Sequence, residues 1–62
     1  MPNVFIYWLE GKKKEQKQKV VEGVTKVMEE AGINKDIVSI SFFEIPPENI
    51  AKGGVLFSER EK

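Results

Sequence analysis

The chain has 62 residues, enough for a single domain, and its ten basic residues balance its ten acidic residues. Non-specific nucleic-acid binding needs a positive excess or a segregated basic face, so this balance argues against a nucleic-acid partner. The chain has neither cysteine nor histidine, which excludes disulfides, thiolate metal sites and the commonest general base near neutral pH. No apolar stretch approaches the roughly 20 residues that span a bilayer, and no signal-peptide pattern opens the chain. We therefore expect a cytoplasmic protein that makes no contact with membranes.

The first predicted element is a strand over residues 4–9, an unbroken apolar run rich in β-branched and aromatic side chains. The run is too short for a helix and lacks the alternation of a half-exposed strand, so both of its faces should be covered. Glu10-Gly11 interrupts the run and ends the strand.

A helix is predicted over residues 14–31, where apolar side chains recur at helical spacing and form one stripe. The members of this stripe are Val20, Val24, Val27, Met28 and Ala31. Gly23 costs the helix about 1 kcal/mol relative to alanine, and its small size would permit close packing of the helix on a sheet. Gly32 follows as the expected left-handed end of the helix.

A second strand is predicted over residues 37–43, with side chains alternating between its two faces. Val38, Ile40 and Phe42 share one face, and Ser39, Ser41 and Phe43 share the other. Pro46-Pro47 should end this strand, because proline cannot donate a hydrogen bond to a ladder. A strand, a long helix and a second strand form a βαβ unit, so the two strands should be parallel.

The last part of the chain is predicted to form a short third strand or a hairpin arm. Gly53-Gly54 indicates a tight turn, and residues 55–57 would form the strand that follows it. The charged residues 59–62 are expected to fray, as exposed chain ends do.

The predicted elements leave apolar surface without cover. One helix covers one face of a two-stranded sheet, yet both faces of the first strand are apolar. A lone chain would therefore expose a large apolar patch and unpaired strand edges. A chain of this size without disulfides or metal commonly relies on oligomerisation, and we expect this one to self-associate.

Pro2 is the strongest candidate for proton transfer, although Met-Pro is also a common way for a chain to begin. If Met1 is removed, Pro2 becomes a terminal secondary amine. An unperturbed α-amine has a pKa of about 7.7–8.0, and desolvation lowers such a value because it disfavours the cation. Placed at the start of a covered strand, this amine would be a general base suited to neutral pH. With Met1 attached, the nitrogen is an amide and cannot act as a base.

Five lysines lie close together after the first strand: Lys12, Lys13, Lys14, Lys17 and Lys19. They form either a solvated surface run or a cluster that attracts an anionic substrate. Lys12 is nearest the end of the strand and is the best placed of the five. A nucleic-acid interface would instead need these lysines to form a continuous face with exposed aromatic side chains.

The loop after the second strand offers two further candidates. Glu44 and Glu48 are a possible carboxylate pair for acid–base chemistry, but no pattern in the sequence places them in a pocket. Ile50 is an apolar residue in a polar loop, so it should pack against a pocket wall or a neighbouring subunit.

An ordered set of short segments resembles the 4-oxalocrotonate tautomerase family across nearly the whole chain. The set comprises Met1-Pro2, Leu9-Glu10-Gly11, Glu15-Gln16-Lys17, Glu44, Pro46-Pro47-Glu48-Asn49 and Gly53-Gly54. The resemblance implies one tautomerase-like domain over residues 1–62, of the α+β class. It implies a βαβ subunit with a short C-terminal hairpin, which pairs into a four-stranded sheet backed by two helices in a dimer. Three such dimers usually form a hexamer.

The resemblance also implies a function, that of a cofactor-independent isomerase without a metal. In it, Pro2 moves a proton between oxygen and carbon of a small 2-keto, 2-hydroxydienoic or enolpyruvate-type acid. Well-known members hold the anionic substrate with two arginines and wall the pocket with an aromatic side chain. Here Lys12 replaces one arginine, keeping the charge but losing the bidentate fork. Ser39 replaces the other and Ile50 replaces the aromatic wall.

The loss of both arginines leaves a second interpretation open. A member of the family without catalytic activity would serve as an oligomeric assembly module or an anion-binding module. Retention of Pro2 argues against that alternative, and the substrate-binding roles of Lys12, Ser39 and Ile50 remain expectations.

Overall fold

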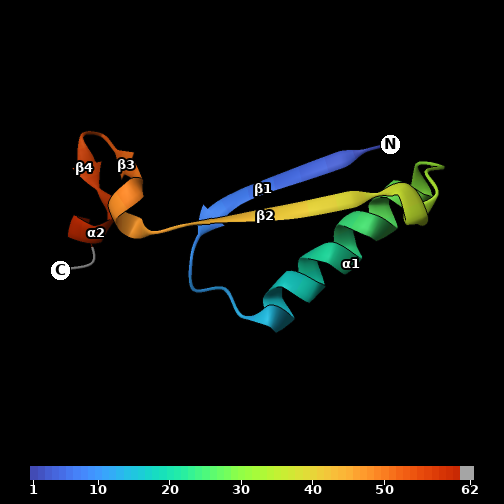
Figure 1. The fold of residues 1–62 in the computed structure, drawn as a ribbon, viewed down its shortest axis with the longest axis horizontal. Coiled ribbons are helices and arrows are strands. Elements are labelled where there is room, and N and C mark those ends of the chain that lie inside the picture. The colour runs from blue at the N-terminus through green and yellow to red at the C-terminus, as the bar shows by residue number, and fades with distance from the viewer. Residues whose placement is uncertain (61–62) are drawn as a thin grey trace.

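A computed structural model describes residues 1–60 of the chain. In chain order the elements are β1 (Asn3–Leu9), α1 (Lys14–Glu30), η1 (Lys35–Ile37), β2 (Ser39–Ile45), η2 (Pro47–Asn49), β3 (Ala51–Lys52), β4 (Val55–Leu56) and α2 (Phe57–Arg60). Figure 1 shows two parts, which we call the body (residues 3–45) and the arm (residues 46–60). The body is a strand–helix–strand unit, and the arm extends beyond the end of β2.

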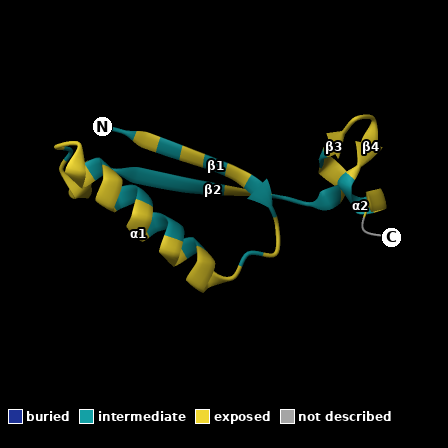
Figure 2. Cartoon of the chain, turned by 180° about the vertical axis from the view of Figure 1, so that it is seen from behind, coloured by how far each residue is buried: buried dark blue, intermediate teal, exposed yellow. Residues whose placement is uncertain are grey.

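The two long strands pair in parallel, as predicted. Their register runs from Asn3 opposite Ser39 to Leu9 opposite Ile45. The helix α1 lies along one face of this sheet (Figure 1). The exposure of the residues alternates along β1 from Asn3 to Trp8. Val4, Ile6 and Trp8 are half-buried, and the residues between them are exposed (Figure 2).

The helix α1 ends close to where the sequence predicted, with Gly32 in the left-handed conformation at φ +89°. Two details of the prediction are wrong. Gly23 is exposed, and a Cβ added there would meet nothing within 4 Å, so it does not bring the helix close to the sheet. Val27 is 63% exposed and Ala31 is exposed at the C-cap, so both lie outside the covered stripe, whereas Val21 is half-buried. The covered face is thus rotated from the one predicted.

The strand β2 begins two residues later and ends two residues later than predicted. Ile37 instead belongs to the 3-10 turn η1. The side-chain oxygen of Asn34 accepts a hydrogen bond of 2.9 Å from the Asp36 N–H, a local contact that favours a turn over an extended strand. Pro46 follows the strand directly, which confirms the predicted end signal. Val38 precedes the strand. Phe42 stacks on Trp8 and Phe43 stacks on Tyr7, so these two side chains lie on opposite faces of the sheet, as predicted.

The arm is held together by its own contacts. The strands β3 and β4 form a hairpin around Gly53 and Gly54, both at positive φ, as the predicted turn requires. The Phe57 N–H donates to the Ile50 carbonyl at 2.9 Å. The Arg60 guanidinium donates to the carbonyl of Lys52 and lies 5.5 Å from the centre of the Phe57 ring.

Three predictions for the arm need correction. The strand predicted over residues 55–57 is shorter, because Phe57 begins the helical turn α2. Residues 51 and 52 form a strand that the sequence did not indicate, because two residues are too few for a detectable pattern. Glu59 and Arg60 were expected to fray but belong to the helical turn α2, which the Arg60 contacts hold in place. The remainder of that prediction, residues 61–62, lies outside the described residues.

The subunit has no closed core of its own. No side chain among residues 1–60 is fully buried. Away from α1, Phe5, Tyr7 and Phe43 form an aromatic patch, with exposures of 57%, 66% and 41%. We call this side of the sheet the open face. The Cα radius of gyration is 15.0 Å, against about 11 Å for a compact chain of this length. None of the described helices is long and apolar enough to cross a membrane.

Candidate functional site

Pro2 lies at the amino end of β1 and is half-buried. Its carbonyl accepts a hydrogen bond of 3.1 Å from the Ser39 N–H, so parallel pairing brings these two predicted site residues together. Asn3 is the register partner of Ser39, and Phe5 is the partner of Ser41. The sheet positions nearest Pro2 therefore offer neutral hydrogen-bonding groups and apolar surface.

Lys12 lies near the opposite end of β1, in the connection to α1. Its ammonium Nζ donates to the Leu9 carbonyl at 3.2 Å and lies 5.3 Å from the centre of the Trp8 ring. Within residues 1–60, Lys12 has no carboxylate partner within 4.0 Å. A half-buried ammonium that is held in place, and whose charge no carboxylate balances, can bind an anion.

The other lysines of the cluster are arranged differently. Lys17 forms an ion pair with Glu44 at 2.6 Å, joining α1 to β2. Lys13, Lys14 and Lys19 are exposed. The structure thus distinguishes Lys12 from its neighbours, whereas the sequence could rank it only by position.

Ile50 lies in the arm, beyond the carboxyl end of β2, and is half-buried. Its backbone joins the arm's own hydrogen bonds, and its N–H points to the Pro47 carbonyl at 3.5 Å. Glu48 is exposed in the turn η2, and Glu44 is occupied by its ion pair with Lys17. The contacts therefore do not support a carboxylate pair for acid–base chemistry.

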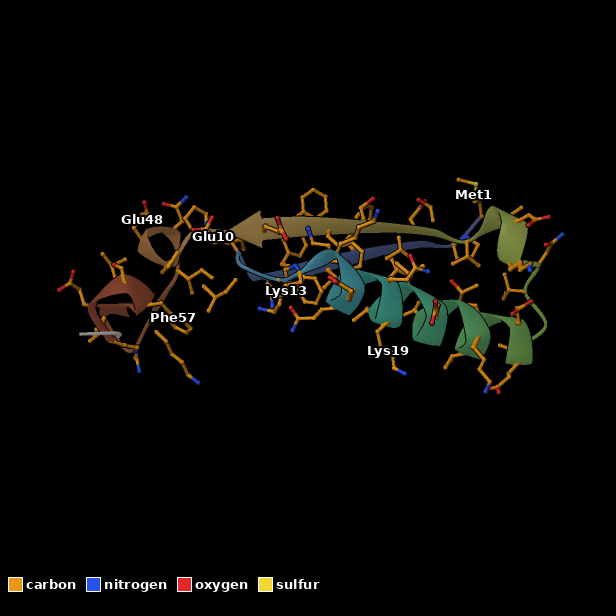
Figure 3. All side chains as sticks on the ribbon, turned by 90° about the horizontal axis from the view of Figure 1, so that it is seen from below. Met1, Glu10, Lys13, Lys19, Glu48 and Phe57 are labelled. Atoms are coloured by element: carbon orange, nitrogen blue, oxygen red, sulfur yellow. The ribbon has the colours of Figure 1, made fainter. Side chains whose placement is uncertain are left out.

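The predicted site residues fall into two groups at opposite ends of the sheet. Pro2 and Ser39 are at the amino end, and Lys12 and Ile50 are beyond the carboxyl end. β1 is seven residues long, and at about 3.3 Å per residue it separates the two ends by about 20 Å. Figure 3 shows this division, with Met1 at one end and Glu10 and Glu48 toward the other. One subunit does not bring the two groups together.

Two surface hollows of the lone subunit are elsewhere. They lie along the outer flank of α1 and are lined by Lys14, Glu15, Gln18, Lys19, Glu22, Gly23 and Lys26. Apart from Gly23, these residues have charged or polar side chains. Lys14 and Lys19 belong to the predicted lysine cluster, but Pro2, Lys12, Ser39 and Ile50 are not among them. No group of three metal-ligating side chains occurs among residues 1–60. The hollows adjoin neither Pro2 nor Lys12, so we do not assign them a catalytic role.

Trp8 is the residue at the site that sequence analysis missed, since it treated the side chain only as part of an apolar strand. The available signal was the short spacing to Lys12 across Glu10-Gly11. Gly11 has φ +102°, a conformation that glycine adopts readily. The turn it makes lets Lys12 fold back over the ring of Trp8.

Comparison with known proteins decides the family. Residues 2–60 match the profile of the family described as Tautomerase enzyme. The chain belongs to the tautomerase family. The resemblance seen in the sequence is thereby confirmed, and the chain is an isomerase of the 4-oxalocrotonate tautomerase type.

Individual tautomerases agree with this assignment. The chain is 40% identical over 60 residues to a 2-hydroxymuconate tautomerase of Comamonas testosteroni, covering 95% of each chain. A solved 4-oxalocrotonate tautomerase isozyme of Methylibium petroleiphilum is 37% identical, with a TM-score of 0.87 over 98% of this chain and all of that one. A heterohexameric 4-oxalocrotonate tautomerase of Chloroflexus aurantiacus is 25% identical, with a TM-score of 0.84 over 95% of this chain and 97% of that one. The predicted α+β subunit is the fold of these tautomerases.

Proposed function

We propose that this tautomerase acts in the cytoplasm as a cofactor-independent enzyme on a small 2-keto, 2-hydroxydienoic or enolpyruvate-type acid. The amine of Pro2, freed by removal of Met1, is the general base. One observation supports this most directly: the family match begins at Pro2 and not at Met1. The chain contains no histidine or cysteine that would compete for the role.

The proposed reaction is a proton shift within one molecule. The lone pair of the Pro2 amine takes the proton of the enol hydroxyl as the O–H bond breaks. The oxygen electrons form the carbonyl, and the electrons of the C=C bond take the proton back from Pro2 to form a C–H bond. Substrate and product have the same composition, so no co-reactant is needed. A nearby cation binds the carboxylate of the substrate and also stabilises the negative charge that develops on oxygen.

That cation would be Lys12 of a second copy, because Lys12 and Pro2 of one subunit are at opposite ends of the sheet. In the described subunit, β1 pairs only with β2, so its other edge is open. Two copies whose β1 edges pair in antiparallel fashion would place the start of one strand beside the end of the other. The product is a four-stranded sheet backed by two helices. Three such dimers in a hexamer would cover the open faces.

The other predicted residues have supporting roles in this proposal. The Ser39 side chain hydrogen-bonds a polar group of the small anionic substrate. Ser39 lies beside Pro2, because its N–H donates to the Pro2 carbonyl at 3.1 Å. Ile50 belongs to the arm of another copy and excludes water from the reacting atoms. Exclusion of water strengthens the interaction between Lys12 and the developing negative charge.

Replacement of the base is the direct test. We expect mass spectrometry of protein from its native host to show loss of Met1. Pro2→Ala should lower kcat/KM for ketonisation of an enolpyruvate by about 10²–10⁴, the range for removing a general base. Sedimentation must show the same assembly in both proteins. Equal rates in the two, or complete retention of Met1, would contradict the proposal.

The cation is tested by Lys12→Ala, with Lys19→Ala as the matched control on an exposed lysine of the same cluster. Loss of a hydrogen bond to a charged group should lower kcat/KM by about tenfold to hundredfold, chiefly through a higher KM, and the control should leave both constants unchanged. Mixing Pro2→Ala subunits with Lys12→Ala subunits should then restore part of the activity. In a mixed dimer with shared sites, one site has both substitutions and the other has neither. A mixture as inactive as its components would contradict a shared site.

A further inference from the structure

We propose that Trp8 is a positioning residue for Lys12, holding the ammonium where a substrate carboxylate binds. This inference rests on the proposed function, since it takes Lys12 as the substrate-binding cation. Trp8 itself does not touch the substrate. Its effect on the reaction would therefore act through Lys12 alone.

The ammonium of Lys12 has two anchors in its own subunit. Its Nζ lies 5.3 Å from the centre of the Trp8 ring, inside the roughly 6 Å range of a cation–π contact. The same nitrogen donates to the Leu9 carbonyl at 3.2 Å. A lysine ammonium has three donors, so two remain for a carboxylate.

Trp8 is fixed by the sheet below it. Its ring stacks on Phe42 of the neighbouring strand, with centroids 5.0 Å apart and planes 17° apart. A line of contacts thus runs from β2 through Trp8 to Lys12. Because Phe42 fixes Trp8, the ring offers Lys12 a surface whose position varies little.

The neighbouring lysines show what this arrangement adds. A lysine side chain loses rotamer entropy when it binds a ligand, and it loses less if contacts already hold it in place. Lys13, Lys14 and Lys19 are exposed, and Lys17 is neutralised by Glu44. Lys12 alone among these five is both held in place and without a carboxylate partner in the part of the chain described. The contact with Trp8 therefore selects it as the substrate-binding cation.

Trp8 can be substituted without losing a hydrogen bond. Its indole Nε1 is buried and has no hydrogen-bond partner within residues 1–60. Substitution by leucine or phenylalanine therefore changes the aromatic surface beneath Lys12 and removes no polar contact of the subunit. Trp8→Phe keeps a weaker aromatic face, and Trp8→Leu removes it.

A double-mutant cycle on KM tests the proposal. In the full-length protein, Trp8→Leu should raise KM by about twofold to fivefold with kcat little changed, the effect of losing one cation–π contact. The KM of Trp8→Phe should lie between that of the wild type and that of Trp8→Leu. In a Lys12→Ala background, Trp8→Leu should leave KM unchanged. Ile6→Ala, on the same face of β1 but farther from Lys12, is the control and should lower stability without changing KM. An effect of Trp8→Leu that persists without Lys12 would overturn the proposal.

A binding measurement separates this proposal from the catalytic one. Trp8 is the one tryptophan of the chain, so its fluorescence reports on the ring beneath Lys12. Titration with pyruvate, a small 2-keto acid, should change this fluorescence to saturation in the wild type and in Pro2→Ala, but not in Lys12→Ala. An unchanged wild-type spectrum would overturn the role of Trp8. Full activity of Pro2→Ala would instead overturn the proposed function, whatever the spectrum shows.

Discussion

The body and the arm differ in what determines their positions. In the body, the parallel ladder and the covering helix fix where Pro2 and Ser39 lie relative to each other. In the arm, the contacts are chiefly internal, with α2 lying against η2 and β4 (Figure 1). Ile50 is therefore positioned with respect to the arm only. In the proposed mechanism, the body places the base by itself, and a residue of the arm reaches the site only where the arm meets another copy.

The largest expected effect comes from a charge on the open face of the body. Phe43 is central to the aromatic patch, 4.7 Å from the ring of Tyr7 and 5.9 Å from that of Phe5. Phe43→Asp should abolish assembly and much of the folded structure, because burying an unpaired carboxylate is strongly unfavourable. Sedimentation measures the assembly, and circular dichroism measures the folded structure. Lys26→Asp, on the exposed flank of α1, should leave the assembly intact. Normal assembly of Phe43→Asp would mean that the open face faces solvent.

The next effect concerns the arm. Leu56 is exposed in the lone subunit, so Leu56→Asp should be harmless if the arm stays free. If the arm packs on another copy, the lost burial of one leucine should raise the dissociation constant of the assembly by about tenfold to hundredfold. Dilution followed by sedimentation determines this constant. An unchanged value would show that the arm takes no part in assembly.

A smaller effect is expected where the arm's internal contacts are weakened. Arg60→Ala removes the hydrogen bond to the Lys52 carbonyl and the contact with the Phe57 ring. Together these should stabilise the folded state by about 1–2 kcal/mol. The loss should appear as a lower Tm that still depends on protein concentration, as for any assembly that dissociates on unfolding. A Tm equal to that of the wild type would contradict the role given to Arg60.

The smallest expected effect is a gain in stability from a substitution in the body. Gly23 is an exposed helical position where an added Cβ meets nothing within 4 Å. Gly23→Ala should stabilise the protein by about 1 kcal/mol, since alanine has the higher helix propensity. Urea unfolding at several protein concentrations should show the same increment in each. A destabilised Gly23→Ala would indicate that another copy packs on this flank of α1.

Local signals in the sequence predicted most of the fold. Gly32, Pro46 and Gly53 end or reverse the chain through their own backbone preferences, so their effects could be predicted without a structure. Val27 and Gly23 were misplaced because the covered face of a helix depends on what packs against it. The helical period determines which residues share a face of the helix, but it does not determine which face packs against the sheet.

The candidate site was predicted less completely for the same reason. The proximity of Pro2 and Ser39 follows from the register, which involves residues 37 positions apart in the chain. The contact between Trp8 and Lys12 depends on the φ of Gly11, which the sequence permits but does not require. The proposed approach of Lys12 and Ile50 to Pro2 would depend on the arrangement of copies, which the pattern of one chain does not encode directly.

The absence of any fully buried side chain in residues 1–60 links the amount of enzyme to the rate at which the chain is made. If folding requires partners, newly made chains stay vulnerable to proteases until they meet one another. The amount of folded protein then depends on a power of the chain concentration greater than one. Halving the expression of this protein should therefore reduce its activity in the cell by more than half.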